Sequence, residues 1–367
     1  MGEEFDAIRD SASVDAVWLT AVLHAAGIGL GHRVVSYAAR SIGTGQVGEN
    51  VRYSLVWDGD PEGLPSSVVA KFPSTSAVSR ATARQVDTYR REVGFYRDVQ
   101  HLVSIRTPDI HHVGWDPETH DFVLVMEDIR GAEQGDQIAG CTVDRARAVI
   151  DAAAGLHAPT WNRVAELADL DWLAFPNPER TGQMQVLLGL TLPGFLERYG
   201  GRLTGEEQDI GRAIVDRYPA LGGRVVDWAQ THGAWCVTHA DYRLDNFLFG
   251  VDDGAPAVTV VDWQTTAVGI GPADIAYFVG AGLVTETRRT HERDLVARYA
   301  SGLRSAGVDA DDDAIWEGYV LGSAGGYLMA IIASQIVERT ERGDDMFVTM
   351  ATRHAAQIAD HGLIDLL

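Results

Sequence analysis

The hydrophobic pattern of this chain changes its period after the first 130 residues, and this change constrains the fold most. Five earlier segments have the alternating, β-branched composition of strands: residues 33–42, 51–57, 67–72, 110–113 and 122–126. Residues 79–103, between the third and fourth of them, have the spacing of one long helix. Beyond Gly131 the pattern is mostly helical, except for a short β-rich stretch at residues 235–262. Strands followed by helices predict an α+β fold with a small antiparallel sheet and a larger helical part.

The predicted elements divide the chain into two lobes joined by a short connector. A length of 367 residues corresponds to about two domains of roughly 150 residues each. We place the sheet-containing lobe at residues 1–126, the connector at 127–130 and the helical lobe at 131–367. Ligands tend to bind in clefts between lobes, so both lobes are expected to contribute to one site.

The composition argues against several classes of protein. With 46% hydrophobic and 22% charged residues, the chain is typical of soluble globular proteins. Its net charge of −22 argues against a basic face that binds nucleic acid. Two cysteines, Cys141 and Cys236, are too few for a disulfide framework and indicate a reducing, cytoplasmic setting. The uncharged residues 318–337 predict a buried core helix, not a membrane span.

The chain contains a single lysine, Lys71, and all its other basic residues are arginine. A lysine carries a compact point charge on a flexible stem, whereas arginine is a planar fork. Alternation along the predicted strand places Lys71 on the sheet face opposite Ala70 and Phe72. We therefore interpret Lys71 as a residue that contacts a charged ligand; the alternative is a surface lysine retained by chance.

A glycine-rich hexapeptide, GTGQVG, places Gly43, Gly45 and Gly48 at the spacing of phosphate-binding loops. In a dinucleotide-binding fold this motif opens a helix. Here residues 51–56 predict a strand, so the loop joins two strands and its backbone N–H groups can cover a triphosphate. The alternative is an ordinary glycine-rich hairpin.

Glu92 lies on the apolar side of the predicted helix, because it shares a stripe with Tyr89, Phe95 and Tyr96. A carboxylate that faces inward needs a cationic partner. The predicted partner is Lys71, and the alternative is a solvated Glu92 paired with an arginine of its own helix.

The segment THADYRLDNFLF, residues 238–249, places polar residues between two apolar runs, which is typical of a catalytic loop between short strands. Asp241 and Asn246 are five positions apart, the spacing of the H-x-D-x-x-x-x-N loop of kinases. A carboxylate suits acceptance of a hydroxyl proton, and an amide oxygen can ligate Mg²⁺ without a second negative charge. For Arg243 two interpretations stay open, contact with the transferred phosphate or a salt bridge that braces the loop.

Asp262 follows an apolar strand and is the second predicted metal ligand. Mg²⁺ prefers oxygen ligands and is usually held by one or two protein groups together with substrate phosphates, so Asn246 and Asp262 would suffice. In the alternative interpretation His239 and Asp241 cap a turn and Asp262 caps a strand end.

Together these motifs resemble the aminoglycoside phosphotransferase and choline kinase-like superfamily, which has a protein-kinase-like fold. The resemblance is most specific in HADYRLDN (residues 239–246) and VVDWQ (260–264). The segments LHA (156–158), DWL (171–173) and DIAY (274–277) resemble the ecdysteroid kinase-like branch in particular. The chain departs from protein kinases at Asp262-Trp263-Gln264, where they carry DFG, so a switch based on that phenylalanine is not expected.

The resemblance implies a bilobal fold and transfer of the γ-phosphate of ATP, with Mg²⁺, to a hydroxyl of a small molecule. It implies Asp241 as the catalytic base and Asn246 and Asp262 as the metal ligands. Nucleotide contacts are implied for a further set of residues: Gly43, Gly45, Gly48, Lys71 with its partner Glu92, and the connector backbone at Glu127 and Ile129. Asp274 is expected to brace the catalytic loop.

Two other functions compete with this hypothesis. One is a nucleotide-binding pseudoenzyme that acts as a sensor or interaction module, although the complete set of Lys71, Asp241, Asn246 and Asp262 argues against it. The other is a dinucleotide-dependent oxidoreductase, which rests on the glycine motif alone. We expect a small-molecule hydroxyl acceptor bound by the helical lobe and no nucleic-acid or membrane partner; the sequence sets neither the acceptor's identity nor the oligomeric state.

Overall fold

The computed structural model describes residues 10–43, 48–59, 62–252 and 254–367, which fold into two compact units. The first, here called the sheet unit, runs to His101 and includes Thr107–Arg130. The second, the helical unit, contains Leu102–Arg106 and Gly131–Leu367. The short segment 102–106 therefore belongs to the helical unit, although the sheet unit precedes and follows it in the sequence.

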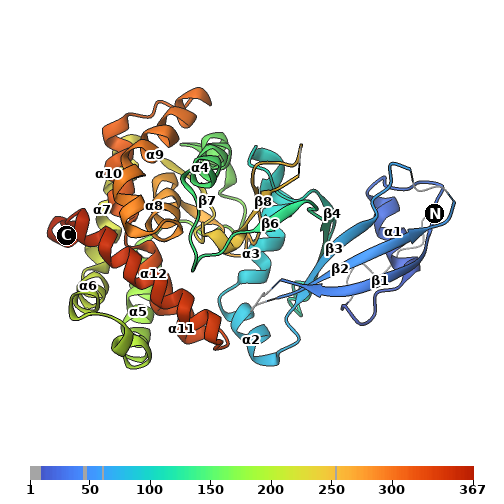
Figure 1. The fold of residues 1–367 in the computed structure, drawn as a ribbon, viewed down its shortest axis with the longest axis horizontal. Helices are drawn as coiled ribbons and strands as arrows, with labels where there is room; N and C mark the ends of the chain where they lie inside the picture. The colour runs from blue at the N-terminus through green and yellow to red at the C-terminus, as the bar shows by residue number, and fades with distance from the viewer. Residues whose placement is uncertain (1–9, 44–47, 60–61, 253) are drawn as a thin grey trace. The chain divides into compact units, whose positions relative to one another are not determined.

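The sheet unit contains one five-stranded antiparallel sheet with the strand order β1-β2-β3-β5-β4 (Figure 1). The strands are β1 (Val34–Ile42), β2 (Gly48–Trp57), β3 (Ser67–Pro73), β4 (Ile110–Trp115) and β5 (Phe122–Glu127). All five predicted strands are present. Because β2 begins at Gly48, the glycine-rich segment joins two strands of a hairpin. This is not the strand–helix arrangement of a dinucleotide-binding fold.

One face of this sheet is covered by helix α1 (Ala16–Ala25), which Asp15 caps by accepting a hydrogen bond from the Trp18 N–H at 2.7 Å. Trp18 forms one buried cluster with Ala70 and Phe72 of β3. Because neighbouring residues of a strand point to opposite faces, Lys71 projects from the other face, as predicted.

The single helix predicted at residues 79–103 is wrong. The structure has α2 (Ala77–Gln85), α3 (Thr88–Gly94), a π-helical turn (Phe95–Val99) and a 3₁₀ turn (Gln100–Leu102). The break falls at Val86 and Asp87, and Asp87 has a left-handed φ of 60°. Valine and aspartate have low helix propensity, and aspartate tolerates the left-handed region better than most residues.

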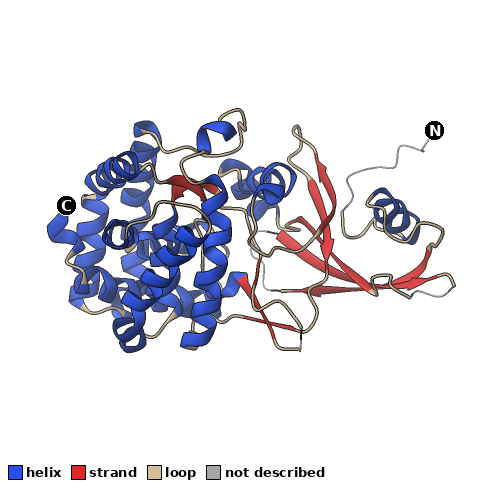
Figure 2. Cartoon of the chain, turned by 90° about the horizontal axis from the view of Figure 1, so that it is seen from above, coloured by secondary structure: helices blue, strands red, loops and turns tan. Residues whose placement is uncertain are grey.

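Helices make up most of the helical unit (Figure 2). They are α4 (Val143–His157), α5 (Pro178–Tyr199), α6 (Gly205–Asp216), α7 (Tyr218–His232), α8 (Gly271–Gly282), α9 (Thr285–Ser305), α10 (Asp312–Gly322), α11 (Gly325–Ile336) and α12 (Glu341–Asp360). Helix α8 is the central element, since all its residues except Ala273 are buried. It packs against α4, α9, α10, α11 and α12.

Short strands among these helices carry the loops of interest. β7 (Trp235–Thr238) pairs with β10 (Ala267–Ile270), and a second sheet has the order β6-β8-β9. Its strands are β6 (Ala132–Gln134), β8 (Phe247–Gly250) and β9 (Thr259–Val260). The β-rich stretch predicted at residues 235–262 is present, and it extends to Ile270. Strands β7 and β8 bound the loop of residues 239–246.

The apolar stretch predicted as one buried helix forms two, because α10 ends at Gly322 and α11 begins at Gly325. Between them the Ser323 hydroxyl donates to the Val320 carbonyl at 2.7 Å. A Cβ at Gly326 would overlap the His354 ring, so glycine lets α11 approach α12. By length and composition Asp312–Ile336 is the one described segment able to cross a membrane, but 67% of its most apolar part is buried in the protein.

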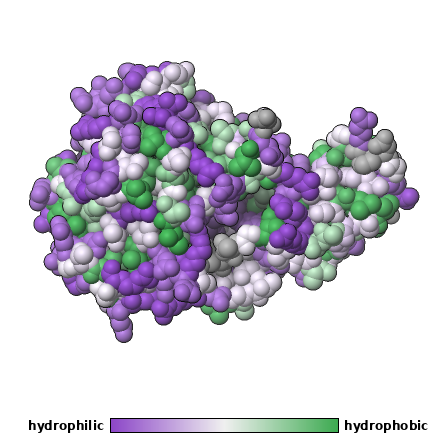
Figure 3. Space-filling model, viewed as in Figure 1, coloured by the Kyte–Doolittle hydropathy of each residue, from purple (hydrophilic) through white to green (hydrophobic). Residues whose placement is uncertain are grey.

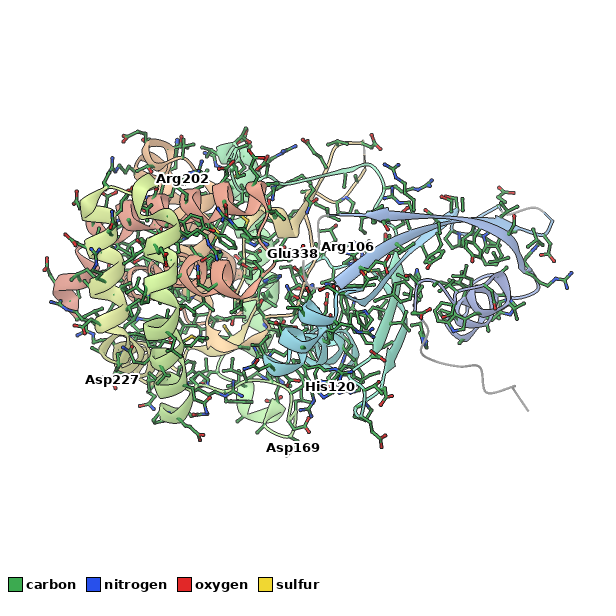
Figure 4. All side chains as sticks on the ribbon, turned by 90° about the horizontal axis from the view of Figure 1, so that it is seen from below. Arg106, His120, Asp169, Arg202, Asp227 and Glu338 are labelled. Atoms are coloured by element: carbon green, nitrogen blue, oxygen red, sulfur yellow. The ribbon has the colours of Figure 1, made fainter. Side chains whose placement is uncertain are left out.

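On the face of the helical unit that Figure 3 shows, hydrophilic residues predominate and hydrophobic residues lie scattered among them. Exposed side chains such as Asp227 and Arg202 lie at its surface (Figure 4). Arg202 forms an exposed ion pair with Asp345 at 2.7 Å. The apolar stretch is thus mostly buried, whereas charged side chains such as Arg202 are exposed, as expected for a folded protein.

Candidate active site

The sheet unit contains a buried ion pair formed by the only lysine of the chain. Lys71 Nζ on β3 lies 2.7 Å from the Glu92 carboxylate on α3, and the two side chains are 10% and 2% exposed. Glu92 is thus buried rather than solvated. The predicted pairing is confirmed, and its role in nucleotide binding stays a prediction.

Gly48 lies directly against this lysine. A Cβ at Gly48 would come within 3.2 Å of Lys71 Cε and 3.0 Å of the Phe72 carbonyl oxygen, so a side chain there would crowd the lysine and the β3 backbone. Gly43 has φ 74°, a conformation that glycine adopts without strain. Gly45 lies outside the described residues. Gly48, the C-terminal end of the predicted phosphate-binding loop, therefore lies against Lys71.

Asp128, in the connector, is a charged anchor that the sequence interpretation overlooked. Its carboxylate accepts hydrogen bonds from Arg52 at 2.8 and 3.0 Å and from the Ser67 hydroxyl at 2.5 Å. Burial alone would raise the pKa of Asp128, but the bonds from Ser67 and Arg52 outweigh it and lower that pKa. Asp128 thus ties the connector to β2 and β3.

The two predicted adenine-binding residues flank Asp128. Glu127 ends β5, and Ile129 lies in the coil that follows. The Glu127 N–H donates to the Asp109 carbonyl at 2.8 Å, and its carboxylate accepts from the Asp109 N–H at 3.1 Å. The Glu127 N–H is thus used by the protein, so the predicted adenine contact at Glu127 and Ile129 would not use that group.

In the helical unit, the loop between β7 and β8 turns through an uncommon conformation. Ala240 has φ 61°, which few residues other than glycine adopt. Asp274, in the first turn of α8, accepts hydrogen bonds from the His239 N–H at 2.7 Å and the Ala240 N–H at 3.0 Å. The predicted bracing role of Asp274 is confirmed, because these two bonds hold the strained turn.

A second layer holds Asp274 in place. His157, at the end of α4, lies with Nε2 3.2 Å from the Asp274 carboxylate and Nδ1 2.7 Å from the Tyr299 hydroxyl. His157 and Tyr299 are fully buried. Three helices, α4, α8 and α9, thus converge behind the turn that precedes Asp241.

Asp241 itself is held by three different side-chain donors. Its Oδ2 accepts from Arg243 Nε and from Asn246 Nδ2, each at 3.1 Å. Its Oδ1 accepts from the Tyr277 hydroxyl on α8 at 2.7 Å. Burial, and then the negative charge of Asp241, raise the pKa of Tyr277 well above its ordinary value, so Tyr277 stays protonated and remains a donor.

The other end of the loop is fixed by arginines. Asp245 accepts from Arg243 at 2.7 Å and from Arg342 of α12 at 2.9 and 3.1 Å. Burial opposes the charge on Arg243, but the carboxylates of Asp241 and Asp245 outweigh it and raise the pKa of Arg243. The bracing salt bridge predicted for Arg243 is present, because its guanidinium links both carboxylates. Its contact with the transferred phosphate stays a prediction.

The predicted metal ligands lie at the same end of one strand pair. Phe247 of β8 pairs with Val260 of β9, and the Val261 N–H donates to the Asn246 carbonyl at 3.0 Å. Asn246 precedes β8 and Asp262 follows β9. Because the amide nitrogen of Asn246 donates to Asp241, the side-chain oxygen is the group left for a cation. An amide and a carboxylate oxygen fit Mg²⁺.

The residue that replaces the phenylalanine of DFG is part of the core. The Trp263 ring is fully buried, and its centroid lies 4.7 Å from that of His239. Asp262 has φ 68°, and its Oδ2 accepts from Gln264 at 3.2 Å. The tryptophan therefore packs against the loop of residues 239–246.

With this geometry established, sequence comparison identifies the family. A family model described as the ecdysteroid kinase-like family matches residues 51–307 of the 367. The chain belongs to this family. No curated protein sequence matches it significantly. The predicted superfamily and branch are confirmed.

Solved structures similar to this ecdysteroid kinase-like chain include small-molecule kinases. A choline kinase from Cryptosporidium parvum Iowa II is 14% identical, with a TM-score of 0.56 over 90% of each chain. Wild-type aminoglycoside 2'-phosphotransferase-IIIa in complex with GDP is 14% identical, with a TM-score of 0.51 over 88% of this chain and 94% of that one. A choline kinase from Streptococcus pneumoniae is 15% identical, with a TM-score of 0.50 over 89% and 94%. The predicted kinase-like α+β fold is confirmed.

Four residues with strong contacts were given no role by the sequence: Asp128, His157, Tyr277 and Arg342. Tyr277 could have been found, because it follows Asp274 by three positions and therefore shares a helix face with a predicted brace. Arg342 lies almost a hundred positions from Asp245, and its sequence context carries no comparable signal.

A cavity of about 960 Å³ in the helical unit is separate from these residues. It is lined by residues 104–106, the end of α4 and residues 306–309, and by none of the predicted site residues. Arg106, labelled in Figure 4, is one of its lining residues. Two charged groups on its wall already have partners, since Asp151 binds Arg298 and Arg163 binds Glu166.

Proposed function

We propose that this member of the ecdysteroid kinase-like family is an ATP- and Mg²⁺-dependent phosphotransferase that acts on a hydroxyl of a small molecule in the cytoplasm. The observation that carries the proposal is the arrangement of Asp241 and Asn246. The amide nitrogen of Asn246 donates to the Asp241 carboxylate. The carboxylate can then serve as the base, and the amide oxygen of Asn246 can serve as a metal ligand. A pseudoenzyme has no need of a base whose carboxylate is held by three donors.

In this mechanism Asp241 accepts the proton of the acceptor hydroxyl as the oxygen attacks the γ-phosphorus. The bond between that phosphorus and the β–γ bridging oxygen breaks, and ADP leaves. Mg²⁺ held by Asn246 and Asp262 would supply charge neutralisation at the phosphates. Lys71, oriented by Glu92, would bind phosphate oxygens as a point charge.

Nucleotide binding is supported by the fold relatives, one of which is a GDP complex. In this proposal Lys71 would supply a cation and the glycine-rich segment before β2 would supply backbone donors, which are the groups that phosphates need. No nucleic-acid or membrane partner is part of the proposal, and the acceptor is expected to bind the helical unit.

The test is an ATP-consumption screen over aminoglycosides, macrolides, choline-like amines and hydroxylated lipids, with Asp241→Asn as the matched inactive variant. We expect one acceptor class to raise ATP turnover in the wild-type protein. We expect Asp241→Asn to lower that turnover about 10²–10⁴-fold, because general-base catalysis contributes this much. Both proteins should bind Mg·ATP with similar affinity.

The same screen separates the rival functions. Binding of Mg·ATP without turnover on any acceptor would favour the pseudoenzyme. Thermal stabilisation by NAD rather than by Mg·ATP would favour the oxidoreductase. Turnover that is equal in wild type and Asp241→Asn would remove Asp241 from the mechanism.

A further inference from the structure

The two oxygens of the Asp241 carboxylate differ in how many hydrogen bonds they already accept. Oδ2 accepts from Arg243 and from Asn246, each at 3.1 Å, whereas Oδ1 accepts from Tyr277 at 2.7 Å. An ionised carboxylate offers about four lone-pair sites on its two oxygens. The two sites of Oδ2 are therefore taken, and one site on Oδ1 is left.

We propose that Tyr277 is a positioning residue that fixes the Asp241 carboxylate so that Oδ1 is the atom that takes the proton from the acceptor hydroxyl. This inference rests on the proposed function, and it deepens it by assigning the accepting atom and the residue that orients it.

Helix α8 is well suited to this task because two of its side chains bind the loop of residues 239–246. Asp274 fixes the backbone of Ala240, and Tyr277, one turn later on the same face, fixes the side chain of Asp241. Tyr277 is 4% exposed, and its ring centroid lies 5.7 Å from that of His354 on α12. The hydroxyl thus comes from a buried helix that packs against its neighbours.

The step balances without a further reactant. The acceptor O–H bond breaks and its proton goes to Oδ1, while the electron pair of that bond forms the new oxygen–phosphorus bond. The bond from phosphorus to the β–γ bridging oxygen breaks and ADP carries that electron pair away. Tyr277 keeps its own proton and donates to Oδ1 throughout.

Tyr277→Phe removes the hydroxyl and keeps the ring. We expect kcat to fall about 10- to 100-fold, the worth of a hydrogen bond to a charged group. The Kd of Mg·ATP should change by less than about twofold, because the hydroxyl contacts the base and not the nucleotide. Tyr319→Phe is the matched control, since the buried Tyr319 hydroxyl donates to the Glu292 carboxylate at 3.1 Å. That control should keep the wild-type kcat.

A double-mutant cycle separates positioning from a merely structural role. In the Asp241→Asn background, Tyr277→Phe should change the residual turnover by less than about twofold, because the carboxylate through which it acts is gone. An equal loss in both backgrounds would show that Tyr277 supports the fold and not the base. A wild-type kcat in Tyr277→Phe would overturn the inference and leave the proposed function intact. A wild-type protein without Asp241-dependent ATP turnover would overturn both.

Discussion

Two predicted site residues, Lys71 of the sheet unit and Asp241 of the helical unit, are held by different sets of partners. The sheet unit pairs opposite charges across elements, Lys71 with Glu92 and Arg52 with Asp128. The helical unit surrounds Asp241 with a guanidinium, an amide and a hydroxyl, and holds the preceding turn through backbone N–H groups.

This difference follows from the tasks proposed for the two units. Phosphate binding needs charge, and an ammonium supplies it with little demand on direction. Proton transfer needs a lone pair that points at the reacting hydroxyl, and several directional hydrogen bonds fix a carboxylate better than one ion pair does. Loss of a charged partner in the sheet unit should therefore mainly lower stability. Loss of an interaction that orients Asp241 should mainly lower turnover.

The largest stability effect is expected at the buried ion pair of the sheet unit. Lys71→Met deprives Glu92, which is 2% exposed, of its cation. Removing one partner of a buried ion pair costs about 3–5 kcal/mol, whereas replacing both by apolar residues is often nearly neutral. We expect urea unfolding to show a loss of this size for Lys71→Met and recovery of most of it in Lys71→Met/Glu92→Leu.

Mg·ATP binding should be weakened in both of these variants, since both lack the ammonium. The matched control is Arg298→Met, because its ion pair with Asp151 is about half exposed and should contribute at most about 1 kcal/mol. If the single and the double variant lose the same stability, charge pairing is not what holds this part of the sheet unit.

A smaller stability effect with a larger effect on turnover is expected at Asp274. Asp274→Asn places an amide where the carboxylate accepts from the His239 and Ala240 N–H groups. Because one acceptor oxygen is replaced by a donor, we expect the free energy of unfolding to fall by about 1–3 kcal/mol. We also expect kcat to fall while the nucleotide affinity is unchanged. A stability loss with unchanged kcat would show that the turn at Ala240 does not orient Asp241.

The sheet unit and the order of the motifs were largely predictable, because both depend on short-range patterns. Alternation placed Lys71 on one face of β3, and the apolar stripe turned Glu92 inward. The break at Val86 and Asp87 was not predictable from periodicity, since no glycine or proline marks it. Propensity differences of a few tenths of a kcal/mol decide such breaks only together with tertiary packing.

The candidate site was predictable where chemistry dictates residue type and spacing, as for Asp241 and Asn246. It was not predictable where partners are distant in sequence. Arg342 reaches Asp245 from α12, and His157 reaches Asp274 from α4, across more than ninety positions each. Only the packing of the helices determines which of the arginines and histidines lies beside the loop.

The smallest effect is a pH-dependent one, in the connector of the sheet unit. Asp128 is 3% exposed, and its folded-state pKa lies below the ordinary value of 3.8. The stabilisation that the Asp128 charge provides is therefore fully present above about pH 4 and is lost as the pH falls through the lowered pKa.

At pH 7 we expect Asp128→Asn to lower the free energy of unfolding by about 1 kcal/mol, a value discounted because Arg52 is 33% exposed. Once the pH lies below the lowered pKa of Asp128, the wild type and the variant should converge in urea unfolding. Arg130→Met removes only a 3.3 Å bond from a side chain that is 59% exposed, so it should leave the profile almost unchanged. A wild-type advantage that persists at low pH would mean that the shape of the Asp128 side chain, and not its charge, ties the connector to β2 and β3.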